Sequence, residues 1–87
     1  MSLILTDQIK NLRIKIDEGE RHGRHAFFVS LTLDGEHSGS FEELDTIDDA
    51  AEYVEIVKSL AADFELANQW DVQDLRDAAT ERISLAY

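Results

Sequence analysis

Residues 25–33 alternate in polarity with a period of two, and this pattern limits the fold more than any other part of the chain. Successive side chains of a strand point to opposite faces of a sheet, so the stretch predicts a strand with one strongly apolar face. That face carries Phe27, Val29, Leu31 and Leu33, and the other carries Ala26, Phe28, Ser30 and Thr32. The chain therefore needs a sheet with a covered apolar side.

A second strand is predicted just upstream, where Leu12, Ile14 and Ile16 alternate with charged residues. The connection over residues 18–23 contains two glycines, which suit a hairpin turn. We expect the hairpin to pair Ile14 with Phe27 and so to set Arg13 opposite Phe28. Before it, apolar residues at helical spacing predict a short N-terminal helix that ends near residue 11.

A third strand is expected to follow Asp34-Gly35, and its register depends on the length of the loop. A two-residue turn would put Glu42 on the buried face and Phe41 outside. A slip of one residue moves every side chain to the other face, so an odd-numbered loop or a bulge would restore Phe41 to the apolar side opposite Val29 or Leu31. We predict the odd loop.

The second half of the chain is predicted to be helical. Thr46 can cap a helix that has acidic residues in its first turn, and the apolar positions from Ile47 to Ala67 cover about half of its circumference. Asp71 is the expected N-cap of a second helix, with Trp70 packed against Leu75 and largely buried. Phe64 is expected in the core. The buried stripe of the second helix is predicted to be Val72, Leu75, Ala79, Ile83 and Ala86.

These elements predict a single α+β domain over residues 1–87. It would contain a three-stranded antiparallel meander, a short N-terminal helix, and two C-terminal helices packed on one face of the sheet. A chain of 87 residues is large enough for one core and too small for two.

The net charge of −11 restricts the classes of partner. Residues 34–65 carry eleven acidic groups and one basic group, whereas residues 1–33 have a net charge of +1. Nucleic acids and anionic membranes attract clustered Lys and Arg, so we expect the protein to bind neither. The chain shows no signal-peptide pattern and no long apolar run, which favours a cytoplasmic protein.

Metal binding and catalysis find no supporting pattern in the sequence. The chain has no Cys, and His22, His25 and His37 are predicted to lie at opposite ends of a strand, too far apart to share one ion. A calcium-binding loop, a glycine-rich phosphate loop and a nucleophile with a nearby base are likewise missing. We therefore expect no enzyme, no cofactor, no metal site and no catalytic residues.

Two surface features could contact a protein partner. One is Phe28 on the polar side of its strand, near two cations; the other is an acidic face on the first long helix, where like charges at helical spacing repel one another. A helix face of this kind would suit a basic partner, although it could equally serve solubility alone. The candidate residues are Phe28, Arg13, Lys15, Asp48, Glu52, Glu55 and Asp63.

The segment Thr46-Ile47-Asp48-Asp49-Ala50, which follows a strand pair and begins a helix, resembles the Thr-x-x-Glu-Ala helix start of the HicB-type antitoxin family. The likeness covers the strand pair and this helix start. The sequence then departs from the family pattern, because it continues with a second helix where the family has another strand. The resemblance implies an antitoxin-like protein that binds a basic partner, and it does not assign the chain to the family.

Three functions remain open from the sequence. The first is a small protein–protein interaction module that also forms a homodimer, since a meander has two open edges. The second is an acidic decoy or inhibitor of a nucleic-acid-binding protein. The third is a small-ligand binder or enzyme, which would require a pocket with convergent polar groups.

Overall fold

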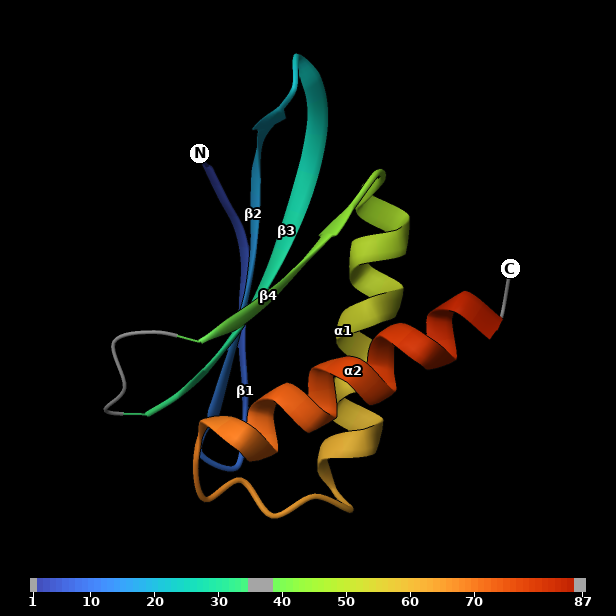
Figure 1. Ribbon diagram of the computed structural model, residues 1–87. Coiled ribbons are helices and arrows are strands. Elements are labelled where there is room, and N and C mark those ends of the chain that lie inside the picture. Colours follow the sequence, from blue (N-terminus) through green and yellow to red (C-terminus); the bar gives the residue numbers. More distant parts are fainter. Residues whose placement is uncertain (1, 35–38, 86–87) are drawn as a thin grey trace.

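The structure, a computed structural model, describes residues 2–34 and 39–85. It is an α+β fold with a four-stranded antiparallel sheet in the order β1-β2-β3-β4, and the two helices lie on one face of that sheet (Figure 1). The elements in chain order are β1 (Ser2–Ile9), β2 (Leu12–Arg21), β3 (Arg24–Leu33), β4 (Ser40–Leu44), α1 (Ile47–Ala61) and α2 (Gln69–Leu85).

The opening segment is a strand, so the predicted N-terminal helix is wrong and the sheet has a fourth strand. Lys10 adopts a left-handed backbone conformation, with φ of 53°, at a tight turn that sets Ile9 opposite Leu12. A helix of this length is marginal on its own in water, whereas β1 gains the hydrogen bonds of a ladder along β2. Pairing with β2 therefore makes this segment a strand, although its apolar residues have helical spacing.

The β2–β3 hairpin is confirmed, but its turn is narrower than predicted. His22 and Gly23 alone form the turn, with φ of 52° and 76°, and two positive φ values are what a type I′ turn requires. The resulting register pairs Ile14 with Leu31, and not with Phe27.

The two faces of strand β4 are the ones that the sequence analysis rejected. The loop whose length was predicted to be odd lies mostly outside the described residues. Phe41 lies opposite Ser30 and Glu42 opposite Val29, so Phe41 is outside and Glu42 is on the side of the helices. The prediction was wrong because it assumed that a carboxylate could not be accommodated there. The Thr80 hydroxyl on α2 donates a hydrogen bond to the Glu42 carboxylate at 3.1 Å, which supplies the missing partner.

Helix α1 begins as predicted. Thr46 is the N-cap, and its hydroxyl accepts a hydrogen bond from the backbone amide of Asp49 at 3.1 Å. The helix ends at Ala61, although the apolar positions predicted for it continue to Ala67. The ammonium of Lys10 donates to the carbonyls of Ala61, Ala62 and Phe64 at 2.9 to 3.3 Å, so the β1–β2 turn satisfies carbonyls at and beyond the helix end.

Helix α2 begins three residues earlier than predicted, and Asn68 is its cap in place of Asp71. The Asn68 side chain accepts from the amides of Trp70 and Asp71, and the Asp71 carboxylate accepts from the amides of Ala67 and Asn68. This reciprocal arrangement resembles a capping box. It turns Trp70 outward, with 76% of its surface exposed, so the prediction of a buried Trp70 is wrong.

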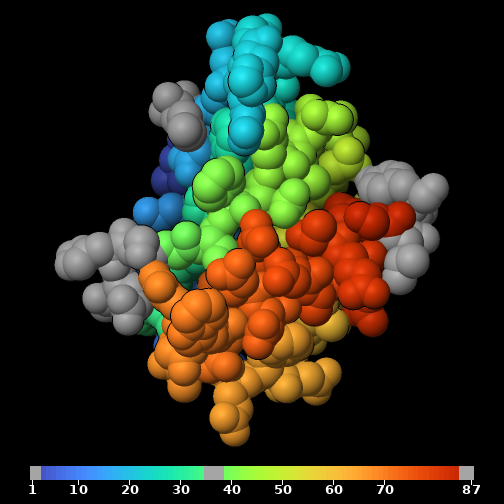
Figure 2. Space-filling view, viewed as in Figure 1, coloured from blue at the N-terminus to red at the C-terminus, as the bar shows by residue number. Residues whose placement is uncertain are grey.

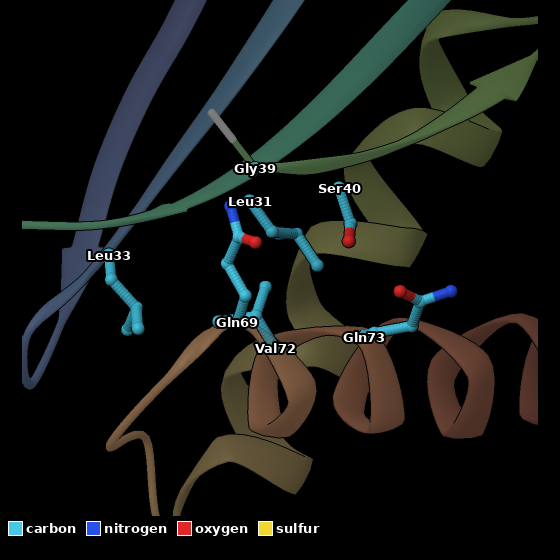
Figure 3. A pocket seen from close by; sticks show the side chains of 7 residues that line it. All are labelled: Leu31, Leu33, Gly39, Ser40, Gln69, Val72 and Gln73. Atoms are coloured by element: carbon cyan, nitrogen blue, oxygen red, sulfur yellow. The ribbon is translucent and has the colours of Figure 1, made fainter. Parts of the chain in front are cut away.

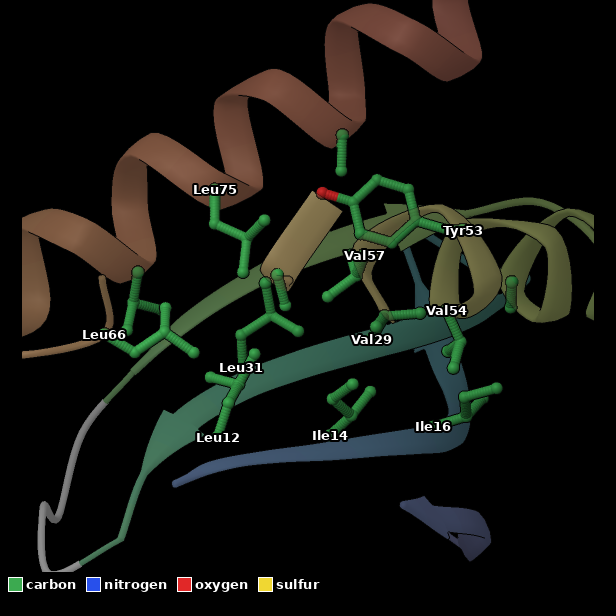
Figure 4. Close-up of a cluster of buried hydrophobic side chains, with 14 of the residues drawn as sticks. Leu12, Ile14, Ile16, Val29, Leu31, Tyr53, Val54, Val57, Leu66 and Leu75 are labelled. Atoms are coloured by element: carbon green, nitrogen blue, oxygen red, sulfur yellow. The ribbon is translucent and has the colours of Figure 1, made fainter. Parts of the chain in front are cut away.

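The core lies between the two helices and the faces of β2 and β3 (Figure 4). Tyr53 of α1 is fully buried, and its hydroxyl points toward α2. Phe64 only packs against the edge of the core. Four members of the predicted α2 stripe are buried, and Ala86 lies outside the described residues. The buried cluster is Leu12, Ile14, Ile16, Val29, Leu31, Leu33, Ala50, Tyr53, Val54, Val57, Ala61, Leu66, Val72, Leu75, Ala79 and Ile83.

Neither helix in the described part of the chain is long and apolar enough to cross a membrane.

Candidate interaction surfaces

One face of the sheet is left uncovered by the helices. Seen from the helix side, α2 crosses the molecule and the β2–β3 hairpin extends beyond the helices (Figure 2). The register places alternate residues of each strand on the opposite face. In β2 to β4 these are Arg13, Lys15, Asp17, Phe28, Ser30, Thr32, Phe41 and Glu43.

An aromatic pair lies on this uncovered face. The rings of Phe28 and Phe41 meet edge to face, with centroids 6.3 Å apart and an interplanar angle of 61°. Phe41 remains 53% exposed. A hollow of about 330 Å³ adjoins the pair, and Ser30 and Thr32 form part of its wall.

One ion pair lies beside the aromatic pair, and a second lies at the end of β3. Arg21 lies 2.9 Å from the Glu43 carboxylate, and Arg13 lies 3.5 Å from that of Asp34. The side chains of both pairs are 31% to 51% exposed, and pairs with this much contact with solvent contribute little to folding stability. Their groups remain accessible to a partner.

The structure separates the predicted candidate residues into two groups. Phe28, Arg13 and Lys15 do share the uncovered face. However, Phe28 lies opposite Asp17, and Arg13 lies opposite Thr32. The predicted pairing of Phe28 with Arg13 is therefore wrong. The hairpin turn lies at His22 and Gly23, later in the chain than that pairing requires.

The second group belongs to the helix layer. Asp48, Glu52 and Glu55 are exposed on α1, and Asp63 is exposed just after the helix ends. Lys58 interrupts this acidic face, since its ammonium lies 2.9 Å from Asp7 of β1 and 4.0 Å from Glu55. The aromatic and acidic features cannot form one continuous surface, because the sheet lies between them.

The ion pair between Asp7 and Lys58 shifts both groups toward their charged forms. The hydrogen bond from Lys58 lowers the pKa of Asp7, with a smaller contribution from the backbone amide of Gln8. The same bond raises the pKa of Lys58. The pair links the outermost strand to α1.

A partly buried chain of hydrogen bonds joins the helices to β4. The Tyr53 hydroxyl lies 3.0 Å from both the Arg76 carbonyl and the Thr80 hydroxyl, and Thr80 in turn donates to Glu42. Burial raises the pKa of Tyr53 to about 12, against the opposing effect of the Thr80 hydrogen bond. The tyrosine is therefore a neutral structural group at physiological pH.

A second hollow, of about 220 Å³, lies between β3, the start of β4 and the start of α2 (Figure 3). Among the described residues, those that line it carry no charge: Leu31, Leu33, Gly39, Ser40, Gln69, Val72 and Gln73. Gly39 is required here, because a Cβ atom would lie only 2.1 Å from the Leu31 carbonyl oxygen.

His25 has contacts other than a metal ion. His25 lies 3.4 Å from the Glu18 carboxylate and stacks on Phe27, with ring centroids 5.0 Å apart. Within residues 2–34 and 39–85, no three His, Cys, Asp or Glu side chains gather as a metal site would require. His37 lies outside the described residues.

Sequence reasoning missed Phe41 as a surface residue. A signal was present in the pattern, because Glu42 and Leu44 share one face of β4 and Phe41 shares the other with Glu43.

Comparisons with protein-family models, curated proteins and solved structures find no match to this chain.

Proposed function

We propose that the protein is a protein–protein interaction module that binds its partner with the uncovered face of the sheet. The observation that carries the proposal is the pair formed by half-buried Phe28 and exposed Phe41 beside a hollow. Protein interfaces commonly combine a central aromatic contact with a polar rim. Arg21 and Glu43 would belong to such a rim.

The experiment compares recovery of partners from an extract of the native cells by the wild-type protein and by two variants. Phe41→Thr removes the ring but keeps a residue that favours strands. Trp70→Gln is the matched control, because it removes another exposed aromatic residue from a different element, α2. Circular dichroism establishes that both variants fold.

We expect the Phe41→Thr variant to recover its partner at least about tenfold less well, since a central aromatic contact contributes about 2 kcal/mol or more to binding. The Trp70→Gln variant should bind like the wild type. Equal recovery by all three proteins, or loss with Trp70→Gln alone, would contradict the assignment of this face.

A second candidate function uses the acidic residues of α1 to bind a basic protein as a decoy or inhibitor. Its support is that Asp48 and Glu55 are exposed on the helix, away from the aromatic pair. A complex of this kind should weaken steeply as salt is added, and in the Asp48→Asn/Glu55→Gln double variant. Binding that depends on Phe41 and tolerates salt favours the sheet face.

A further inference from the structure

The outer edge of β1 is the most exposed apolar element of the molecule. This strand has eight residues, and in the described chain it pairs with β2 alone, at the end of the sheet. Leu3, Ile4 and Leu5 are 58%, 42% and 39% exposed. A long apolar edge with unpaired backbone groups is a template for another strand.

The edge is also poor in charge. Asp7 is the one ionisable side chain between Ser2 and Ile9, and its carboxylate is paired with Lys58. The whole chain carries a net charge of −11, so two copies repel each other over most of their surfaces. At β1 this repulsion is smallest, because residues 1–33 have a net charge of +1.

We infer that a second copy of this chain pairs with β1, antiparallel to it and related by a two-fold axis. An antiparallel edge is complementary to itself under this symmetry, which is the commonest in soluble assemblies. Leu3 and Leu5 would be covered on the two faces of the joined sheet. Only the register that sets the two copies of Asp7 directly opposite each other brings like charges together, and it is disfavoured.

The dimer site at the edge of β1 is separate from the aromatic surface that the proposed function assigns to partner binding. Phe28 and Phe41 lie on β3 and β4, so pairing at β1 leaves them free. Dimerisation would therefore present two copies of the aromatic surface on one continuous sheet. The two-fold axis is perpendicular to that sheet and keeps both helix layers on the same side.

The first test measures the mass in solution by light scattering coupled to size exclusion, at micromolar concentration. We expect twice the chain mass of 9.9 kDa, and a dimer that tightens as ionic strength rises from about 0.01 M to about 1 M, since salt screens the mutual repulsion. The Leu3→Lys/Leu5→Lys double variant should weaken the dimer at least about tenfold. Phe41→Lys, the matched control on the other edge strand, should leave the dimer intact.

The second test is amide hydrogen exchange. Outward-facing amides of β1 should exchange more slowly in the wild type than in the double variant, and protection should rise with protein concentration. A monomer at both salt concentrations overturns the inference, and so does a dimer that the double variant forms equally well. Loss of partner binding with Phe41→Thr at unchanged dimer mass would support the proposed function separately.

Discussion

The two edges of the sheet are built differently. Strand β1 presents eight residues with three exposed apolar side chains and a single charged one. Strand β4 presents five residues, two of which are Glu42 and Glu43, and α2 is bonded to it. Arg76 donates to the Phe41 carbonyl at 3.2 Å, and Thr80 donates to Glu42 at 3.1 Å.

Short length, charge and contact with a helix are the usual means by which proteins protect a sheet edge. Strand β4 has all three. Strand β1 is long and poor in charge, and it has a register shift between Leu3 and Leu5, the ion pair between Asp7 and Lys58, and the contacts of its turn with the end of α1. The comparison teaches that the helices of this fold hold one edge in place and leave the other available for association.

The largest expected effect concerns the buried junction behind β4. Tyr53→Ala should lower the free energy of unfolding by about 3–5 kcal/mol, because it leaves a cavity and removes the hydroxyl partner of Thr80. Leu5→Ala on the exposed edge should cost less than about 1 kcal/mol. Chemical denaturation followed by circular dichroism measures the free energy of unfolding of both variants. Similar losses in the two would contradict the view that the helices hold β4 more firmly than β1.

The next effect appears at alkaline pH. The folded protein holds the Tyr53 proton up to a pKa of about 12, whereas the unfolded chain releases it near 10. The stabilisation is therefore complete below pH 10 and is lost as the pH rises toward 12. The loss is on the order of 2–3 kcal/mol.

Tyr53→Phe is the matched control for this alkaline transition. It keeps the ring but has no group that can ionise, so its stability should fall less between pH 10 and 12. Denaturation curves at several pH values measure the difference. Parallel pH profiles for the two proteins would contradict a buried, neutral Tyr53.

A smaller effect is expected where β4 begins. Gly39→Ala should cost about 1–3 kcal/mol and speed amide exchange throughout β4, since the new methyl group forces the strand away from the Leu31 carbonyl. Gly23→Ala is the control. Nothing lies within 4 Å of its Cβ position, and its positive φ costs about 1–2 kcal/mol without disturbing β4. Unchanged exchange in β4 with Gly39→Ala would mean that the contact is easily relieved.

The smallest effect concerns the one ion pair that joins β1 to α1. Lys58→Met should raise the pKa of Asp7 toward its ordinary value, measured by NMR titration of the carboxyl group. A lowered pKa in the folded state stabilises the protein above the unfolded value of 3.8, and this contribution is lost as the pH falls through the folded pKa. The variant should therefore show a flatter acid profile and faster exchange in β1, with β4 unaffected.

Some of the fold could be predicted because the interactions are local. The Thr46 cap bonds to an amide three residues away, and the alternation from Phe27 to Leu33 needs no knowledge of the partner strand. The position of Phe28 outside the core follows from that same alternation. These predictions held because neighbouring residues supply the deciding contacts.

Other predictions failed because the deciding contact is distant in sequence, whereas the α2 cap and the β2–β3 turn were wrongly predicted although their contacts are local. Phe41 faces outward because Glu42 accepts a hydrogen bond from Thr80, 38 residues later in the chain. No local sequence pattern predicts that hydrogen bond. The aromatic pair exists only because this register brings Phe41 beside Phe28. The sequence alone therefore predicted Phe28 as a surface residue but not Phe41.

The sequence by itself determined the α+β class, the faces of β2 and β3, and the start of α1, because periodicity and capping act over a few residues. Only the tertiary structure decided that residues 2–9 form a strand, which edge of the sheet is left open, and which aromatic residues meet. Those outcomes depend on strand pairing and on helix contacts between residues far apart in the chain, where one hydrogen-bonded carboxylate can outweigh local hydrophobic preference.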